Sequence, residues 1–129
     1  LAPAGSNLIQ FADMIKHTTG KSAWSYNHYG CYCGWGGSKQ PVDATDRCCQ
    51  AHDCCYKRIS SFLCRPKMVK YNYSAWGSKI TCGSGSVCEM RSCECDKRAA
   101  ECFQRTARSY DDRYKKYPKY LCKGKTPSC

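Results

Sequence analysis

The sequence lacks any run of about 18 consecutive apolar residues, the length a membrane-spanning helix needs. We therefore expect no segment of it to cross a membrane. No apolar segment follows a basic start, so the sequence shows no signal peptide, and we expect a mature chain. Acidic residues and histidines are also few. The 129 residues have the size of one domain with a modest core.

Cysteine, by contrast, is abundant: the chain has 14, all between positions 31 and 129. This density is typical of a disulfide-linked scaffold, and an even number can pair without leaving a free thiol. Because disulfides persist in oxidising compartments, we expect a secreted, extracellular protein. Zinc binding is the alternative use of cysteine, but it needs separated Cys and His pairs at metal-ligand spacing, which the sequence does not show.

Positive charge is the second strong bias. The chain carries 21 Lys and Arg against 10 Asp and Glu, a formal net charge of +11, and the basic residues concentrate in 57–70 and 97–125. Such a surface attracts anionic lipids, sulfated glycans or nucleic acids, although many of these charges are expected only to be solvated. An extracellular setting favours lipids and glycans, so we expect no nucleic-acid partner.

The chain opens with the small-residue segment "LAPAGS". We interpret residues 1–6 as a linker, an expression scar or a propeptide remnant. A short amphipathic helix is predicted over about 8–18, with Asn7 as its N-cap and Gly20 as its stop. Core packing and contact with lipid explain its apolar stripe equally well. The stripe consists of Leu8, Ile9, Phe11, Ala12, Met14 and Ile15.

A Gly-rich loop and a long helix are predicted next. Residues 29–41 contain four glycines and a proline, which favours a tight loop. Cap-type residues precede "RCCQAHDCCYKRISSF", which predicts a helix over 46–62. The cap-type residues are Asp43, Thr45 and Asp46. One stripe of this helix carries Cys48, Cys55 and Phe62. A second stripe carries Cys49, His52, Asp53 and Tyr56.

The segment "KYNYSAWGSKITC" predicts a small β-hairpin that turns at Gly77. Residues 87–109 contain no Gly or Pro and predict the second long helix, followed by a loop-like tail. Cys88, Cys95 and Cys102 share one face of this helix, and Asp96 and Ala99 lie beside it. Disulfides between the two long helices would bring His52 toward Asp96. The predicted fold is mainly α and disulfide-rich, with two long antiparallel helices.

His52 is the candidate general base because an imidazole, with an ordinary pKa near ~6.5, exchanges protons readily at neutral pH. Asp96, on the facing helix, is the candidate for orienting its ring. A purely structural role is the alternative for a single histidine. No serine lies in a Gly-x-Ser-x-Gly motif, so water is the expected nucleophile.

Asp53 follows His52 directly, but the two side chains of a helix point about 100° apart. Asp53 is therefore better placed to serve a cation than to orient its neighbour. The Gly-rich loop can supply backbone carbonyl oxygens, because Cys33 can tether it to the helix. A carboxylate with carbonyl oxygens makes the all-oxygen site that Ca²⁺ prefers, so the loop is a candidate calcium-binding loop.

Three motifs carry a resemblance to a known family. "YGCYCGWGG", "CCQAHDCCY" and "CECDKRAAEC" resemble the calcium loop, the active-site helix and the second long helix of secreted phospholipase A2. The resemblance covers residues 7–129, which we interpret as the phospholipase domain. The terminal Cys129 and a first helix without cysteine resemble the group II branch.

The resemblance implies a role for each site residue. His52 corresponds to the general base, Asp96 to the carboxylate that orients it, and Asp53 to the bidentate calcium ligand. The carbonyls of Tyr32, Gly34 and Gly36 correspond to the other protein ligands of calcium, and the Gly34 N–H to an oxyanion donor. The supporting tyrosines correspond to Tyr56 and Tyr71, and the apolar acyl channel to Leu8, Phe11 and Ile15. The implied disulfides are Cys31–Cys122, Cys33–Cys49, Cys48–Cys102, Cys54–Cys129, Cys55–Cys95, Cys64–Cys88 and Cys82–Cys93.

The implied activity is calcium-dependent hydrolysis of the sn-2 ester of glycerophospholipids at a membrane interface, with an anionic membrane as the preferred partner. Non-enzymatic relatives replace the calcium aspartate, often by Lys, whereas this chain keeps Asp53. The alternative is a toxin or binding protein of the same fold that binds heparin-like glycans, another polyanion or a cell-surface receptor independently of catalysis. Its support is a basic segment with interleaved tyrosines: Arg113, Tyr114, Lys115, Lys116, Tyr117, Lys119 and Tyr120.

One feature departs from the family pattern. Mature family members start at the residue equivalent to Asn7, and their free amino group joins a hydrogen-bond network with the residue equivalent to Gln10. Here six residues precede Asn7. If they are retained, the amine is an amide, and we expect lower activity on aggregated lipid.

Overall fold

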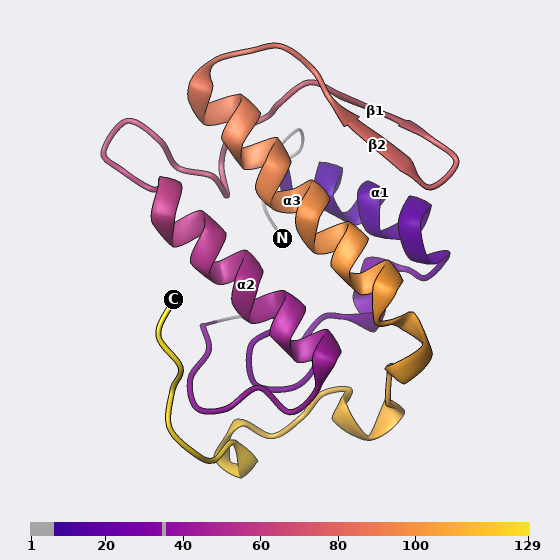
Figure 1. Ribbon diagram of the computed structural model, residues 1–129, viewed down its shortest axis with the longest axis vertical. Helices are drawn as coiled ribbons and strands as arrows, with labels where there is room; N and C mark the ends of the chain where they lie inside the picture. The colour runs from indigo at the N-terminus through magenta and orange to yellow at the C-terminus, as the bar shows by residue number, and fades with distance from the viewer. Residues whose placement is uncertain (1–6, 35) are drawn as a thin grey trace.

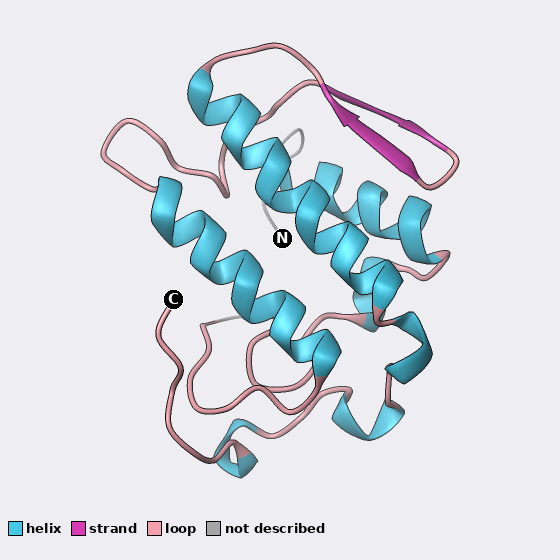
Figure 2. Cartoon of the chain, in the orientation of Figure 1, coloured by secondary structure: helices cyan, strands magenta, loops and turns pink. Residues whose placement is uncertain are grey.

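The computed structural model describes residues 7–34 and 36–129, so the predicted linker at 1–6 lies outside the described residues. The fold is mainly helical, as predicted (Figures 1 and 2). Helix α1 spans Asn7–Thr19, α2 spans Ala44–Ile59 and α3 spans Val87–Arg105, with strands β1 (Tyr73–Trp76) and β2 (Lys79–Cys82) before α3. The short 3₁₀ turns are η1 (Ala23–Ser25), η2 (Ala107–Ser109), η3 (Asp112–Tyr114) and η4 (Lys119–Leu121).

Helices α2 and α3 lie side by side and run antiparallel, and α1 packs against α3 (Figure 1). Helix α2 begins where the Asp43 side chain accepts from the backbone N–H of Asp46. Helix α3 begins with a capping box between Ser86 and Glu89, in which each side chain accepts from the other's backbone N–H. Among the described residues, no helix has the length and apolarity to cross a bilayer.

The predicted end of α2 at residue 62 is wrong. The helix stops at Ile59, because Ser60 adopts an extended backbone and its hydroxyl donates to the carbonyl of Tyr56 at 2.6 Å. Phe62 therefore does not continue the stripe of Cys48 and Cys55; it lies in the following turn and is 89% exposed. Helix α3 ends at Arg105 rather than 109, because the Thr106 hydroxyl donates to the carbonyl of Cys102 at 3.1 Å.

The structure of helix α1 shows that the predicted N-cap is wrong and indicates what part of the apolar stripe does. Asn7 is not a cap: it is the first helical residue, it is fully buried, and its amide donates to the Tyr56 hydroxyl at 2.9 Å. Met14 and Ile15 are buried in the core, so core packing accounts for that part of the apolar stripe. Ile9 lies on the outer side of the helix and is 51% exposed.

The hairpin prediction is confirmed: β1 and β2 pair antiparallel, from Tyr73 opposite Cys82 to Trp76 opposite Lys79, and Gly77 turns with a positive φ of 59°. The tail after α3 is more ordered than a loop. It contains three 3₁₀ turns, and Tyr110, Tyr114 and Tyr117 pack against the main core.

All cysteines are in disulfides, so the zinc alternative is wrong and the disulfide scaffold is confirmed. Two disulfides join α2 to α3, and others tether the Gly-rich loop, the hairpin and the tail to these helices. The connectivity matches the one implied by the family resemblance: Cys31–Cys122, Cys33–Cys49, Cys48–Cys102, Cys54–Cys129, Cys55–Cys95, Cys64–Cys88 and Cys82–Cys93.

Candidate active site

The structure brings His52 of α2 and Asp96 of α3 together across the helix pair. The Nε2 atom of His52 lies 2.7 Å from Oδ1 of Asp96. Asp96 is fully buried, and the His52 side chain is 12% exposed. The disulfides Cys48–Cys102 and Cys55–Cys95 hold the two helices in this register from either side of the pair. The imidazole and the carboxylate that bonds it therefore lie on two helices that disulfides cross-link.

Two tyrosines complete the surroundings of the Asp96 carboxylate. The Tyr56 hydroxyl donates to Oδ1, and the Tyr71 hydroxyl donates to Oδ2 at 2.7 Å. Burial, followed by the negative charge of Asp96, raises the pKa of both phenols well above the usual value. Both therefore stay protonated, and the carboxylate keeps hydrogen-bond donors on both oxygens. This compensates the cost of burying its charge.

Two residues of helix α1 form hydrogen bonds with the tyrosines that bond Asp96. Asn7 donates to the Tyr56 hydroxyl and to the carbonyl of Pro66. The Gln10 side chain donates to the carbonyl of Tyr71 at 2.6 Å and accepts from its N–H at 3.1 Å. The role of Asn7 was missed because an Asn before an apolar stripe is a common cap signal, and nothing local distinguishes a cap from a buried donor.

The predicted channel residues lie on α1, and one of them, Phe11, lies beside the histidine. The Phe11 ring stacks on the His52 ring, with centroids 4.5 Å apart, and its centroid lies 6.4 Å from that of Phe103. Ile15 is buried in the core, whereas Leu8 and Phe11 are partly buried. One apolar ring of α1 thus lies against the imidazole.

The Gly-rich loop and Asp53 line one cavity of about 560 Å³. Tyr32, Gly34 and Gly36 border it from the loop, and Asp53 borders it from α2. Gly34 and Gly36 have positive φ angles of 109° and 58°, which side chains with a Cβ rarely adopt. The structure therefore brings together the four residues expected at a calcium site.

The chemistry of this cavity fits a cation. Burial raises the pKa of Asp53 to about 6, and Coulomb interactions with His52, Lys67 and Lys119 only partly offset that effect. A cation beside the carboxylate would favour its charged form. Among the described residues, no cluster of three or more His, Cys, Asp or Glu is placed so that it could hold a metal ion. The donor set is one carboxylate with backbone carbonyls, which suits Ca²⁺ rather than a transition metal.

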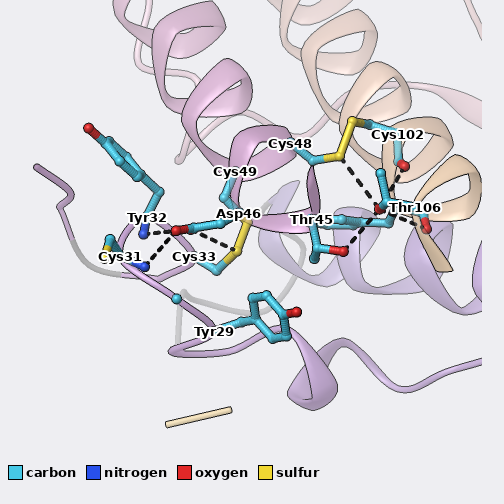
Figure 3. Close-up of a disulfide and its surroundings, with 12 residues drawn as sticks. Tyr29, Cys31, Tyr32, Cys33, Thr45, Asp46, Cys48, Cys49, Cys102 and Thr106 are labelled. Carbon is cyan, nitrogen blue, oxygen red and sulfur yellow. Dashed lines mark hydrogen bonds between the residues drawn. A yellow bond between two sulfur atoms is a disulfide. The ribbon is translucent and has the colours of Figure 1, made fainter. Parts of the chain in front are cut away.

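Asp46 holds the start of the Gly-rich loop (Figure 3). Its buried carboxylate accepts from the backbone N–H groups of Cys31 and Tyr32 at 2.8 Å and of Val42 at 2.9 Å. A Cβ at Gly30 would lie 2.5 Å from its Cγ, so only glycine fits there. The sequence indicated Asp46 only as a cap-type residue, and its bonds to the loop were missed. Asp43 is the cap.

The basic tail is partly engaged within the fold. The Arg113 guanidinium pairs with Asp111 at 2.6 Å, and the Lys119 amine donates to the carbonyl of Gly30 at 3.1 Å. Tyr114 and Tyr117 meet edge to face, and both pack on the core. Only part of the segment 113–120 is therefore available to a partner.

Comparison with known proteins agrees with this geometry. A sequence model of the family described as phospholipase A2 matches residues 8–115. The chain belongs to the phospholipase A2 family and has its hydrolase activity, as the sequence resemblance indicated. Members of this family typically use Ca²⁺ and act on phospholipid membranes.

Within that family, the chain is a secreted, group II phospholipase A2. It is 52% identical over 126 residues to "Group IIE secretory phospholipase A2" of Mus musculus, an alignment covering 98% of this chain and 89% of the relative. "Phospholipase A2, membrane associated" of Homo sapiens is 50% identical over 130 residues, covering 100% and 90%. "Basic phospholipase A2 myotoxin I" of Bothrops asper is 51% identical over 124 residues, covering 95% and 88%.

Proposed function

We propose that His52 is the general base for attack of water on the sn-2 ester of a glycerophospholipid, with Asp96 as its positioning residue. The bond of 2.7 Å between Nε2 of His52 and buried Asp96 carries this proposal. Because the carboxylate accepts, Nε2 holds the ring proton and Nδ1 keeps a lone pair. Nδ1 can then take a proton from water.

A single base accounts for both proton transfers of the reaction. The water oxygen bonds to the ester carbonyl carbon while His52 removes its proton. The tetrahedral intermediate then breaks its bond to the glycerol oxygen, and the imidazolium returns the proton to that oxygen. The products are a fatty acid and a lysophospholipid. Phe11, stacked on the imidazole, would exclude bulk water and, with Leu8 and Ile15, would contact the acyl chain.

The same site is proposed to depend on calcium. The Asp53 carboxylate and the carbonyls of Tyr32, Gly34 and Gly36 would hold the ion, as their shared cavity supports. When bound, calcium would supply a Lewis acid for the ester carbonyl and the oxyanion. The backbone N–H of Gly34 would donate to the same oxyanion. Substitutions of His52 and of Asp53 test these roles. For each variant, turnover and calcium binding are measured separately.

An anionic membrane surface is the proposed site of action, and the net charge of +11 supports it. Adsorption to anionic vesicles should weaken by at least about tenfold as salt rises from about 0.1 M to about 1 M. The reason is that the Debye length falls from about 10 Å to about 3 Å. Vesicle co-sedimentation without turnover measures this, with zwitterionic vesicles as the control. Adsorption to anionic vesicles that is indifferent to salt would contradict the proposal.

Residues 1–6 are proposed to lie outside the functional domain and to restrain it. A chain that starts at Asn7 should hydrolyse vesicles about tenfold faster than the full chain, because its charged amine can bond near the buried Asn7 network. Dispersed monomeric substrate should show a smaller gain. The matched control is the same short chain with an acetylated amine. Equal rates of vesicle hydrolysis for the full and short chains would contradict this proposal.

Polyanion or receptor binding independent of catalysis is a second candidate function. The tail segment 113–120 supports it only weakly, because Arg113 and Lys119 already have partners. Exposed arginines of α2 and α3 support polyanion binding more strongly, since no acid pairs with them among the described residues.

A further inference from the structure

The β-hairpin begins with a short motif that the proposed reaction does not use. Asn72, Tyr73 and Ser74 form the pattern Asn-x-Ser with no proline in the middle, which is the acceptor sequence for an N-linked glycan. The sequence has two other asparagines, Asn7 and Asn27, and neither is followed two positions later by Ser or Thr. The motif therefore singles out one asparagine of the chain.

The structure places this asparagine at the surface. Asn72 and Ser74 are exposed, whereas Asn7 is fully buried and Asn27 is partly buried. The carbonyl of Asn72 accepts from the backbone N–H of Gly83 at 2.8 Å, so the hairpin ladder continues by one bond beyond β1 and β2. The asparagine of the acceptor motif is thus also the one whose side chain reaches solvent.

The two faces of the hairpin have different surroundings, because successive residues of a strand point to opposite faces. Tyr71 is buried and its hydroxyl donates to Asp96, so the side chain of its neighbour Asn72 points away from that carboxylate. Ser74 and Trp76 are exposed on the same face as Asn72, and Trp76 is 86% exposed. A group attached to Asn72 would therefore extend into water from the outer face of the hairpin.

Gly83 keeps the position beside Asn72 open. It lies opposite Asn72 in the ladder, and a Cβ there would lie 3.1 Å from the Cβ of Asn72. The side-chain nitrogen Nδ2 of Asn72 donates to the carbonyl of Ser84 at 3.0 Å. Because an amide nitrogen carries two protons, one N–H remains for this bond when a sugar replaces the other. The folded hairpin therefore accommodates a sugar on Nδ2 and keeps its hydrogen bonds.

The route of secretion supplies the other reactant. A secreted, disulfide-linked chain passes through the oxidising lumen of the endoplasmic reticulum, where N-linked glycans are attached. The donor class is an oligosaccharide joined at its C1 atom to a lipid pyrophosphate. The bond between Nδ2 and C1 forms as the bond from C1 to the pyrophosphate oxygen breaks. The pyrophosphate leaves with the bonding electron pair, and Nδ2 releases one of its protons to solvent.

We propose that Asn72 is a glycosylation site and carries an N-linked glycan on the outer face of the hairpin. The glycan is bulky and hydrophilic, so it keeps this face, including the exposed Trp76, in water. This goes beyond the proposed function, because none of the residues proposed for catalysis or for calcium takes part.

The test is the mass of the full chain after secretion from a mammalian cell line under a cleavable secretion signal. We expect a mass above that of the sequence, which an N-glycan amidase removes. In heavy-oxygen water this enzyme should convert Asn72 to a labelled Asp, which peptide mapping locates. Asn72→Gln and Ser74→Ala should each lose the added mass, whereas Ser74→Thr should keep it, because Thr also completes the motif. The matched control Ser78→Ala, in the turn of the same hairpin, should keep it as well.

Three results would overturn the proposal. The first is a folded, secreted parent chain at the mass of its disulfide-linked sequence. The second is added mass that persists in Ser74→Ala, and the third is a label that maps to a residue other than Asn72. Because Asn72→Gln and Ser74→Ala remove the motif at different residues, a folding failure of one leaves the other informative. No turnover is measured, so failure of the His52 proposal leaves this result unchanged.

Discussion

Replacing His52 with Gln is expected to lower kcat for phospholipid hydrolysis by about 10³-fold, within the range of about 10²–10⁴ that a general base supplies. Gln can occupy the space between Phe11 and Asp96, but it has no basic nitrogen to take a proton from water. The hydroxyls of Tyr56 and Tyr71 still donate to Asp96. The fold should therefore persist, and thermal unfolding should change little.

The matched control for this substitution is His17→Gln. His17 lies on α1 near Asp13, at 3.6 Å, and its ring nitrogen bonds the carbonyl of Gly77, so it has no contact with Asp96. Its loss should leave kcat within about twofold. Product release from dispersed monomeric substrate measures both variants without the complication of adsorption. Turnover of His52→Gln within tenfold of the parent would refute His52 as the base.

Replacing Asp53 with Lys is expected to lower turnover by at least about 10³-fold, because a Lewis acid contributes several kcal/mol of charge stabilisation. The ammonium would place positive charge in the cavity and oppose the cation directly. Calcium should also cease to raise the thermal unfolding temperature, because a ligand stabilises only the state that binds it. That readout needs no substrate, so it separates loss of metal from loss of chemistry.

The control for the charge change is Asp112→Lys, an exposed acid in the tail turn η3. It should keep both calcium stabilisation and turnover. Removing calcium from the parent chain with a chelator should reproduce the effect of Asp53→Lys on turnover. Full hydrolysis in the presence of the chelator would contradict the proposed dependence on calcium.

The main elements followed from local patterns. Apolar spacing predicted α1, and the Gly-free, Pro-free cysteine segment predicted α3. The local pattern gave wrong predictions where a polar residue type is compatible with two structural roles. Asn7 has the composition of a cap but is a buried donor to Tyr56, and "RCCQAHDCCYKRISSF" continues past the point where the Ser60 hydroxyl ends α2. Local composition does not predict which hydrogen-bond partner a polar side chain has in the folded protein.

The number of cysteines predicted the disulfide scaffold, and residue spacing predicted the three helices and the candidate pair His52 and Asp96, because spacing within a helix sets which side chains share a face. How those faces meet depends on the tertiary structure. It placed the Asp46 carboxylate under the Gly-rich loop, closed the tail tyrosines onto the core, and gathered arginines some 50 residues apart around one cavity between α2 and α3. Such contacts depend on the docking of cross-linked elements, which no local period encodes.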